Sequence, residues 1–122
     1  MKKDIILIVE DHEDIQAIYK DMLGDKYDLI QVISAEDAQK VLDKQKVDLM
    51  ILDIILPKQS GDTFLVYLKQ KNKFKDLKVI CITVLGDVSK QLQKIDPKVK
   101  CIPKPFKKNE LLEVIEAELK RV

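Results

Sequence analysis

The sequence is poor in the residues on which small disulfide-rich or zinc-centred folds depend. It has two cysteines, one histidine and three glycines in 122 residues. Cys81 and Cys101 lie inside apolar runs without CxxC spacing, and a zinc site would need further soft ligands that the chain does not offer. We therefore expect two buried, reduced thiols, as is usual in cytosolic proteins, and neither a disulfide framework nor a zinc site.

Long apolar segments and an excess of one charge are missing as well. The N-terminus has too short an apolar stretch and no small-residue cleavage site for a signal peptide, and no run is long enough to span a membrane. Lys and Arg number 22 against 21 Asp and Glu, which gives a net charge of +1. The chain has no overall field to attract nucleic acid or an anionic membrane, so we expect a cytoplasmic protein that binds neither directly.

What the chain does contain is a regular alternation of short apolar runs and helical patterns, without internal repeats or Gly/Ser linkers. Its length and its 46% apolar and 35% charged residues suit one globular domain, residues 1–122. Apolar, largely β-branched runs typical of buried parallel strands cover residues 5–9, 29–33, 47–52, 79–83 and 99–102. Helical patterns follow these runs at residues 15–23, 35–42, 61–68, 88–95 and 111–119.

This pattern predicts an α/β fold, a doubly wound (βα)₅ three-layer sandwich. Because crossovers between parallel strands are right-handed and helices cover both faces, the five-stranded parallel sheet should have the order 2-1-3-4-5. The switch point of that order lies beside strands 1 and 3. Folds of this kind place their ligands in the crevice outside the carboxyl ends of those strands.

Both strands beside the switch point end in acids. Glu10 and Asp11 follow the first strand, and Asp53 follows the third. Like charges held in one crevice raise one another's pKa or need a cation between them, so the arrangement costs stability. A hard divalent ion is the natural partner of such carboxylates, and Mg²⁺ fits that description.

Two further polar residues belong to the same edge of the sheet, since Thr83 ends the fourth strand and Lys104 follows the fifth. The whole set of notable positions comprises Glu10-Asp11, Asp53, Pro57, Gly61, Thr83 and Lys104-Pro105-Phe106. This set resembles the receiver domain of two-component response regulators over essentially the whole chain.

The resemblance implies a role for the acids. Asp53 matches the aspartate that accepts a phosphoryl group from the phosphohistidine of a histidine kinase or phosphotransfer protein. Glu10 and Asp11 match the acidic pair that holds Mg²⁺, and the family adds to that ligand set the acceptor aspartate and the backbone carbonyl of Ile55.

The resemblance also implies how the signal is passed on. Thr83 and Lys104 match the pair that senses the phosphoryl group, and the Lys104-Pro105 peptide is usually cis in such domains. Phosphorylation then shifts the face formed by the fourth helix, fifth strand and fifth helix, a surface that could also carry a homodimer. The protein would catalyse only its own phosphorylation and dephosphorylation and would not be an enzyme with a separate substrate.

Two positions depart from the family pattern. Cys101 occupies the switch position of the fifth strand, where the family usually has Tyr or Phe, and it is too small to report a movement of Thr83 by the same steric route. Val84 stands where the family favours a very small residue. Because Ile55 and Leu85 are also apolar, few polar groups would position an attacking water, and we expect slow self-dephosphorylation.

Three other functions share part of this pattern. A flavodoxin-like protein would bind FMN phosphate after the first strand, but residues 10–14 are mainly acidic and would repel it unless a metal intervened. A metal-dependent hydrolase would carry a second acid where this chain has Ile55. A degenerate receiver that acts as a phosphorylation-independent docking module is the main alternative. His12 precedes Glu13, a pair also found where histidine kinases are phosphorylated, and is interpreted as a polar residue leading into the first helix.

Overall fold

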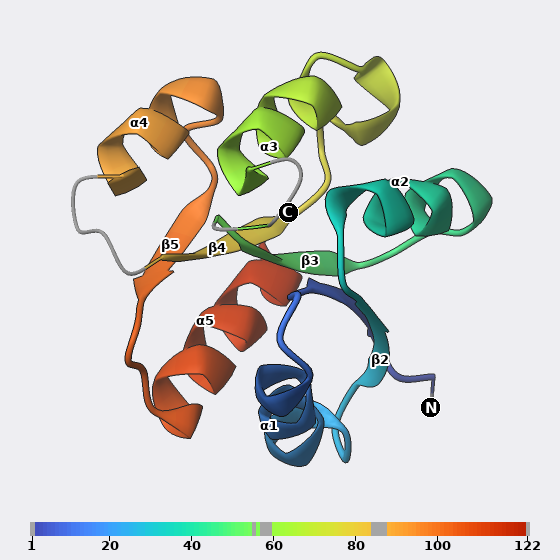
Figure 1. Ribbon diagram of the computed structural model, residues 1–122, viewed down its shortest axis with the longest axis vertical. Coiled ribbons are helices and arrows are strands. Elements are labelled where there is room, and N and C mark those ends of the chain that lie inside the picture. Colours follow the sequence, from blue (N-terminus) through green and yellow to red (C-terminus); the bar gives the residue numbers. More distant parts are fainter. Residues whose placement is uncertain (1, 55, 57–59, 84–87, 122) are drawn as a thin grey trace.

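Five strands form one parallel sheet in the order β2-β1-β3-β4-β5 (Figure 1). The computed structural model describes residues 2–54, 56, 60–83 and 88–121. The strands are β1 (Ile5–Val9), β2 (Asp28–Val32), β3 (Leu49–Asp53), β4 (Val79–Thr83) and β5 (Lys100–Pro103). All neighbouring strands are parallel, so the predicted fold class and strand order are confirmed.

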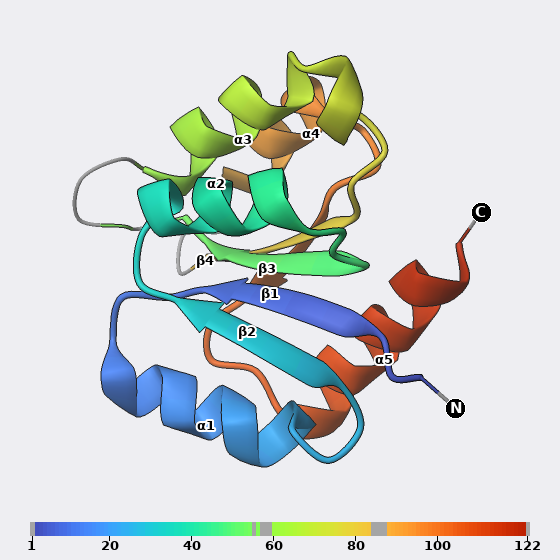
Figure 2. The ribbon, with the colours of Figure 1, turned by 90° about the vertical axis from the view of Figure 1, so that its right-hand side faces the viewer.

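Helices cover both faces of this sheet and make three layers (Figure 2). On one face lie α1 (Glu13–Leu23) and α5 (Lys108–Lys120), and on the other lie α2 (Ala35–Lys44), α3 (Gly61–Lys69) and α4 (Val88–Ile95). A short 3-10 helix, η1 (Asn72–Phe74), follows α3. Among the described helices, none has both the length and the apolar character needed to cross a membrane.

Alternate residues of the central strands feed two separate cores. In β1, Ile6 and Ile8 belong to the core under α1 and α5, whereas Leu7 and Val9 belong to the core under α2 and α3. None of these four side chains is more than 1% exposed. A strand buried on both faces has a continuous apolar run, which is why period-2 alternation is missing from these segments of the sequence.

Strand boundaries differ from the predicted ones where polar residues bind the backbone. The predicted third strand begins at Val47, but β3 begins at Leu49, because the Asp48 carboxylate accepts a hydrogen bond from Ile5 N at 2.8 Å. β2 lies one residue earlier than predicted and β5 one residue later. The helix η1 was not predicted, since its three residues carry no helical pattern.

The helix ends carry charges that complement the backbone dipole. Ser34 caps the start of α2, because its Oγ accepts a hydrogen bond from Asp37 N at 3.1 Å. Acids occupy the first turn and a lysine the last turn of α1, α2, α3 and α5, which is the favourable arrangement. Because each helix runs back against the strands, its acidic first turn lies at the carboxyl edge of the sheet.

Candidate functional site

The register of β1 and β3 brings the acids of the two strands together. Val9 pairs with Leu52, so Glu10 and Asp53 each occupy the next position on adjacent strands. Glu10 is 1% exposed and Asp53 is 7% exposed, so both carboxylates lie in the crevice rather than on the surface. Asp11, one residue further, keeps 26% of its side chain exposed.

Lys104 lies between the two buried acids. Its Nζ donates a hydrogen bond to Asp53 Oδ2 at 3.2 Å and is 3.6 Å from Glu10 Oε1. The backbone N–H of Lys104 donates to the Thr83 carbonyl at 2.8 Å, which ties the end of β5 to the end of β4. The Lys104-Pro105 peptide is cis, as predicted.

Thr83 is the last residue of β4 and is 5% exposed. Asp53 pairs in register with Ile82, so Thr83 lies one position beyond the level of Asp53 on the neighbouring strand. The structure thus places Lys104 in contact with both Glu10 and Asp53, and it places Thr83 at the same edge. Strand ends alone were sufficient to predict this grouping.

The crevice holds more negative than positive charge. Burial raises the pKa of Glu10 above its ordinary value, and the neighbouring carboxyl group of Asp11 and the charge of Asp53 raise it further. Burial likewise raises the pKa of the Tyr19 hydroxyl, with a smaller contribution from the charges of Glu10 and Asp53. Lys104 is one cation against three nearby carboxylates.

Two oxygens of this site are buried without a hydrogen-bond partner among the described residues. They are Glu10 Oε1, which lies 3.6 Å from Lys104 Nζ, and Asp11 Oδ1, which lies 3.2 Å from His12 Nδ1. An acceptor in this state costs free energy unless a donor or a cation satisfies it. Hard carboxylate oxygens beside an excess of negative charge are the donor set that Mg²⁺ takes in proteins, so the residues present fit that ion.

His12 joins the acidic pair in space. Glu10, Asp11 and His12 each offer one ligand atom, and these atoms lie within 4.8 Å of one another. Among the described residues, this group is the one whose geometry suits a metal, and Asp53 is linked to it through Lys104. The sequence interpretation gave His12 no role in the site, although its position directly after two acids at a strand end was an available signal.

Gly61 opens α3 against the backbone of β3. A Cβ at this position would lie 2.4 Å from the Asp53 carbonyl oxygen and 2.7 Å from Ile54 Cα. The Gly61 N–H donates to the Ile54 carbonyl at 2.8 Å, which fixes the approach. Glycine is therefore required here because the backbones come too close for any side chain.

The switch position differs from the acidic half of the site. Cys101 on β5 pairs in register with Cys81 on β4, and both side chains belong to the core under α2 to α4. Both are free thiols, with Cys81 buried and Cys101 half-buried. Contact with Cys101 and burial both raise the pKa of the Cys81 thiol.

Four positions used in the sequence interpretation lie outside the described residues. They are Ile55, Pro57, Val84 and Leu85. The metal ligand expected at the Ile55 carbonyl and the slow dephosphorylation expected from Val84 stay predictions.

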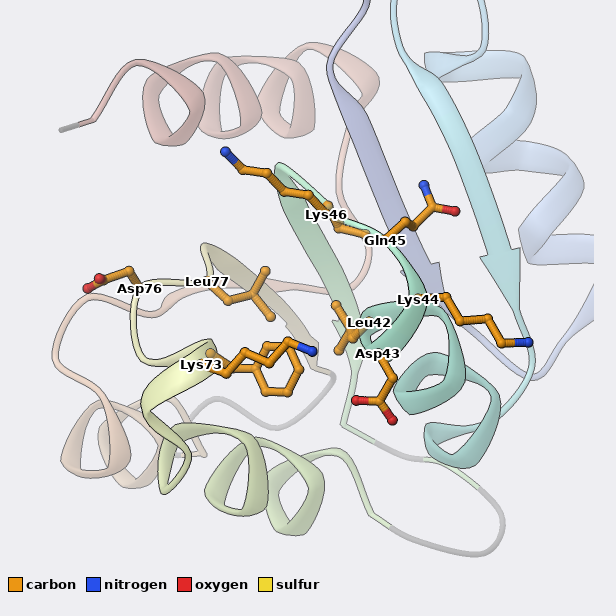
Figure 3. A pocket seen from close by; sticks show the side chains of 10 residues that line it. Leu42, Asp43, Lys44, Gln45, Lys46, Lys73, Asp76 and Leu77 are labelled. Carbon is orange, nitrogen blue, oxygen red and sulfur yellow. The ribbon is translucent and has the colours of Figure 1, made fainter.

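A cavity of about 460 Å³ lies at the opposite end of the sheet (Figure 3). The residues that line it come from the end of α2 and the α2–β3 connection on one side, and from η1 and the connection between η1 and β4 on the other. Lysines and aspartates alternate around an apolar floor, and none of the acids of the crevice takes part. We therefore place the chemistry at the carboxyl edge.

Fold and site together define the class of protein: a doubly wound α/β domain with an acidic crevice at its switch point. The chain belongs to the response regulator receiver domain family, whose family model matches residues 6–116. Receiver domains are the regulatory domains of two-component systems, so the resemblance found in the sequence is confirmed.

Relatives of the chain occur in regulators and in kinases. It is 31% identical over 120 residues to the DNA-binding dual master transcriptional regulator RpaA of Synechocystis sp., covering 95% of this chain and 49% of that protein. It is 31% identical over 110 residues to the sensor histidine kinase TmoS of Ectopseudomonas mendocina, covering 87% of this chain and 11% of that protein. The chain thus spans about half the length of the regulator and about a tenth of the length of the kinase.

Solved structures agree with this assignment. A putative response regulator from Chloroflexus aurantiacus superposes with a TM-score of 0.87 at 27% identity, covering 98% of this chain and all of that one (100%).

Proposed function

We propose that this receiver domain accepts a phosphoryl group on Asp53 from the phosphohistidine of a histidine kinase or phosphotransfer protein, with Mg²⁺ as cofactor. One observation carries the proposal. Lys104 Nζ lies 3.2 Å from Asp53 and 3.6 Å from Glu10, inside a crevice that holds more acids than cations. That arrangement costs stability, so folding alone does not explain it, whereas a role in phosphoryl transfer does.

The chemistry is a displacement at phosphorus. A carboxylate oxygen of Asp53 forms a bond to phosphorus while the bond between phosphorus and the donor histidine nitrogen breaks. The attack is opposed by repulsion between the carboxylate and the phosphoryl oxygens. Lys104 lowers this repulsion through its ammonium, and Mg²⁺, when bound, would neutralise further charge on the transferred group.

Glu10 and Asp11 are the side chains that would hold the ion, with Asp53 and the Ile55 carbonyl as the further ligands that the family implies. Their two buried oxygens without hydrogen bonds support this role. The protein would catalyse only its own phosphorylation and dephosphorylation. It would act in the cytoplasm, without binding nucleic acid through this domain.

The output would pass through Thr83 and Lys104. A phosphoryl group on Asp53 adds charge and acceptor oxygens next to both residues, and so favours one of two arrangements of the surface formed by α4, β5 and α5. The hydrogen bond from the Lys104 backbone to the Thr83 carbonyl supports a joint response of the two strand ends. The same surface is the one we propose for a homodimer.

Labelling tests the proposal directly. With acetyl phosphate or a phosphohistidine donor and Mg²⁺, intact-mass spectrometry should show one added phosphoryl group that is stable to acid and labile to base. The group should be lost in Asp53→Asn and in the presence of EDTA. Asp62→Asn, in the first turn of the neighbouring α3, is the matched control and should label normally.

Absence of labelling with every donor would overturn the proposal. It would favour the phosphorylation-independent docking module. Labelling that persists in Asp53→Asn would place the acceptor elsewhere.

A further inference from the structure

The imidazole of His12 lies beside the acidic pair. Its Nδ1 lies 3.2 Å from Asp11 Oδ1 and 3.4 Å from Glu10 Oε2. Ligand atoms bound at about 2.1 Å to one ion are about 3.0 Å apart at right angles in an octahedron and about 3.4 Å apart in a tetrahedron. Both observed separations fall in the range that a single ion would impose.

Each of the two acids beside His12 has a carboxylate oxygen that a cation would satisfy. Glu10 is 1% exposed and its Oε1 has no hydrogen-bond partner among the described residues, as is true of Asp11 Oδ1. His12 itself is 67% exposed and makes no side-chain cap to α1, although it stands at the N-cap position. The imidazole can therefore exchange its contacts with the carboxylates for a metal without breaking the fold.

An imidazole changes which ions such a site prefers. Oxygen ligands alone suit Mg²⁺, whereas a nitrogen ligand favours Mn²⁺, Zn²⁺ and other first-row transition ions. We propose that His12 supplies a nitrogen ligand to the divalent-metal site, which gives the site a preference for transition ions over Mg²⁺. This inference rests on the proposed function only in sharing its metal site.

The composition of the chain makes the test sharp, because His12 is its single histidine. Untagged protein labelled with ¹⁵N-histidine carries the label at this residue alone. Pulsed EPR of the Mn²⁺-loaded protein should then show nitrogen coupling that changes from the ¹⁴N to the ¹⁵N pattern on labelling. Absence of a coupling that responds to the label would overturn the proposal.

Affinity gives the second measurement. Isothermal titration without any phosphoryl donor should show that His12→Ala weakens Zn²⁺ binding by about tenfold or more, since loss of an outer-shell partner alone costs that much. Mg²⁺ binding should change less than about threefold. The matched control is Glu13→Ala, which removes the exposed neighbour outside the metal group and should change the ratio of the two affinities less than threefold.

An unchanged ratio of Zn²⁺ to Mg²⁺ affinity in His12→Ala would overturn the proposal. If that variant did not fold, the EPR experiment on the wild-type protein would still decide. The proposed function is tested separately, because failure of His12 to bind metal leaves Mg²⁺-dependent labelling of Asp53 intact.

Discussion

The two halves of the carboxyl edge are built on different principles. At the ends of β1 and β3 the functional side chains are acids, and Glu10 and Asp53 are almost fully buried. At the ends of β4 and β5 they are a hydroxyl and an amine, and behind these lies an ordinary apolar core that includes Cys81 and Cys101. The acidic half is strained by its own charge, whereas the other half supplies the cation that offsets it. We therefore expect mutations in the two halves to have different effects on phosphorylation and on signal output.

Removal of the Lys104 ammonium group should have the largest effect on the stability of the acidic half. Lys104→Ala leaves Glu10 and Asp53 without their counter-charge. We expect the free energy of unfolding at neutral pH in EDTA to fall by about 2–4 kcal/mol. This is less than for a deeply buried pair because the Lys104 side chain is 25% exposed. Urea denaturation followed by circular dichroism measures the loss, and Mg²⁺ should restore part of it.

The control for this variant is Lys108→Ala, an exposed lysine in the first turn of α5. It should be near neutral. If Lys104→Ala also left the free energy of unfolding unchanged, the stability of the acidic half would not depend on this lysine. The proposed difference between the two halves would then be wrong.

A steric change can disturb the acidic half without altering its charge. Gly61→Ala places a Cβ against the Asp53 carbonyl and Ile54 Cα, so the strand end or the start of α3 must shift. Thermal and urea unfolding should show a loss of about 1–3 kcal/mol, and labelling of Asp53 should slow. Asp62→Ala, at the next position of the same helix, is the control. Normal stability and labelling in Gly61→Ala would mean that the close approach does not matter.

Neutralising Glu10 should change the free energy of unfolding by a smaller amount and should increase it. Glu10→Gln removes a buried charge that faces Asp53, and in EDTA we expect the free energy of unfolding to rise by about 1 kcal/mol. The same variant should bind Mg²⁺ more weakly, as isothermal titration would show. If Glu10→Gln were less stable than the wild type in EDTA, repulsion between the carboxylates would not be the main cost in the acidic half.

The smallest effect is expected in the other half. Cys101→Ala shortens a half-buried side chain away from the acids, and it should cost about 0.5 kcal/mol and leave labelling of Asp53 unchanged. Phosphorylation should still shift the NMR amide signals of residues 88–121 in this variant. The wild-type residue at position 101 is not aromatic, so the substitution removes no ring that could carry the signal. Loss of labelling would show that the two halves cannot be separated.

The sequence predicted the fold and the candidate site for the same reason. Parallel strands buried on both faces leave continuous apolar runs, and polar residues directly after such runs must meet at one edge. Glu10, Asp53, Thr83 and Lys104 were placed in this way. What the sequence could not show depended on atomic contacts between distant segments.

Three particular residues illustrate this limit. Asp48 interrupts an apolar run because its carboxylate binds Ile5 N, a partner far away in the sequence. The requirement for glycine at position 61 depends on its distance from β3. His12 was interpreted as a polar helix-entry residue because its distance from Glu10 and Asp11 could not be known.

The uniform direction of the helices has a consequence for how partners approach. Acids gather in the first turns of α1, α2, α3 and α5 at the carboxyl edge, so this edge is locally acidic although the net charge of the chain is only +1. An acidic edge attracts the basic surface of a partner before the two proteins touch. The rate of encounter with a partner that carries basic residues around its phosphohistidine should therefore fall as ionic strength rises.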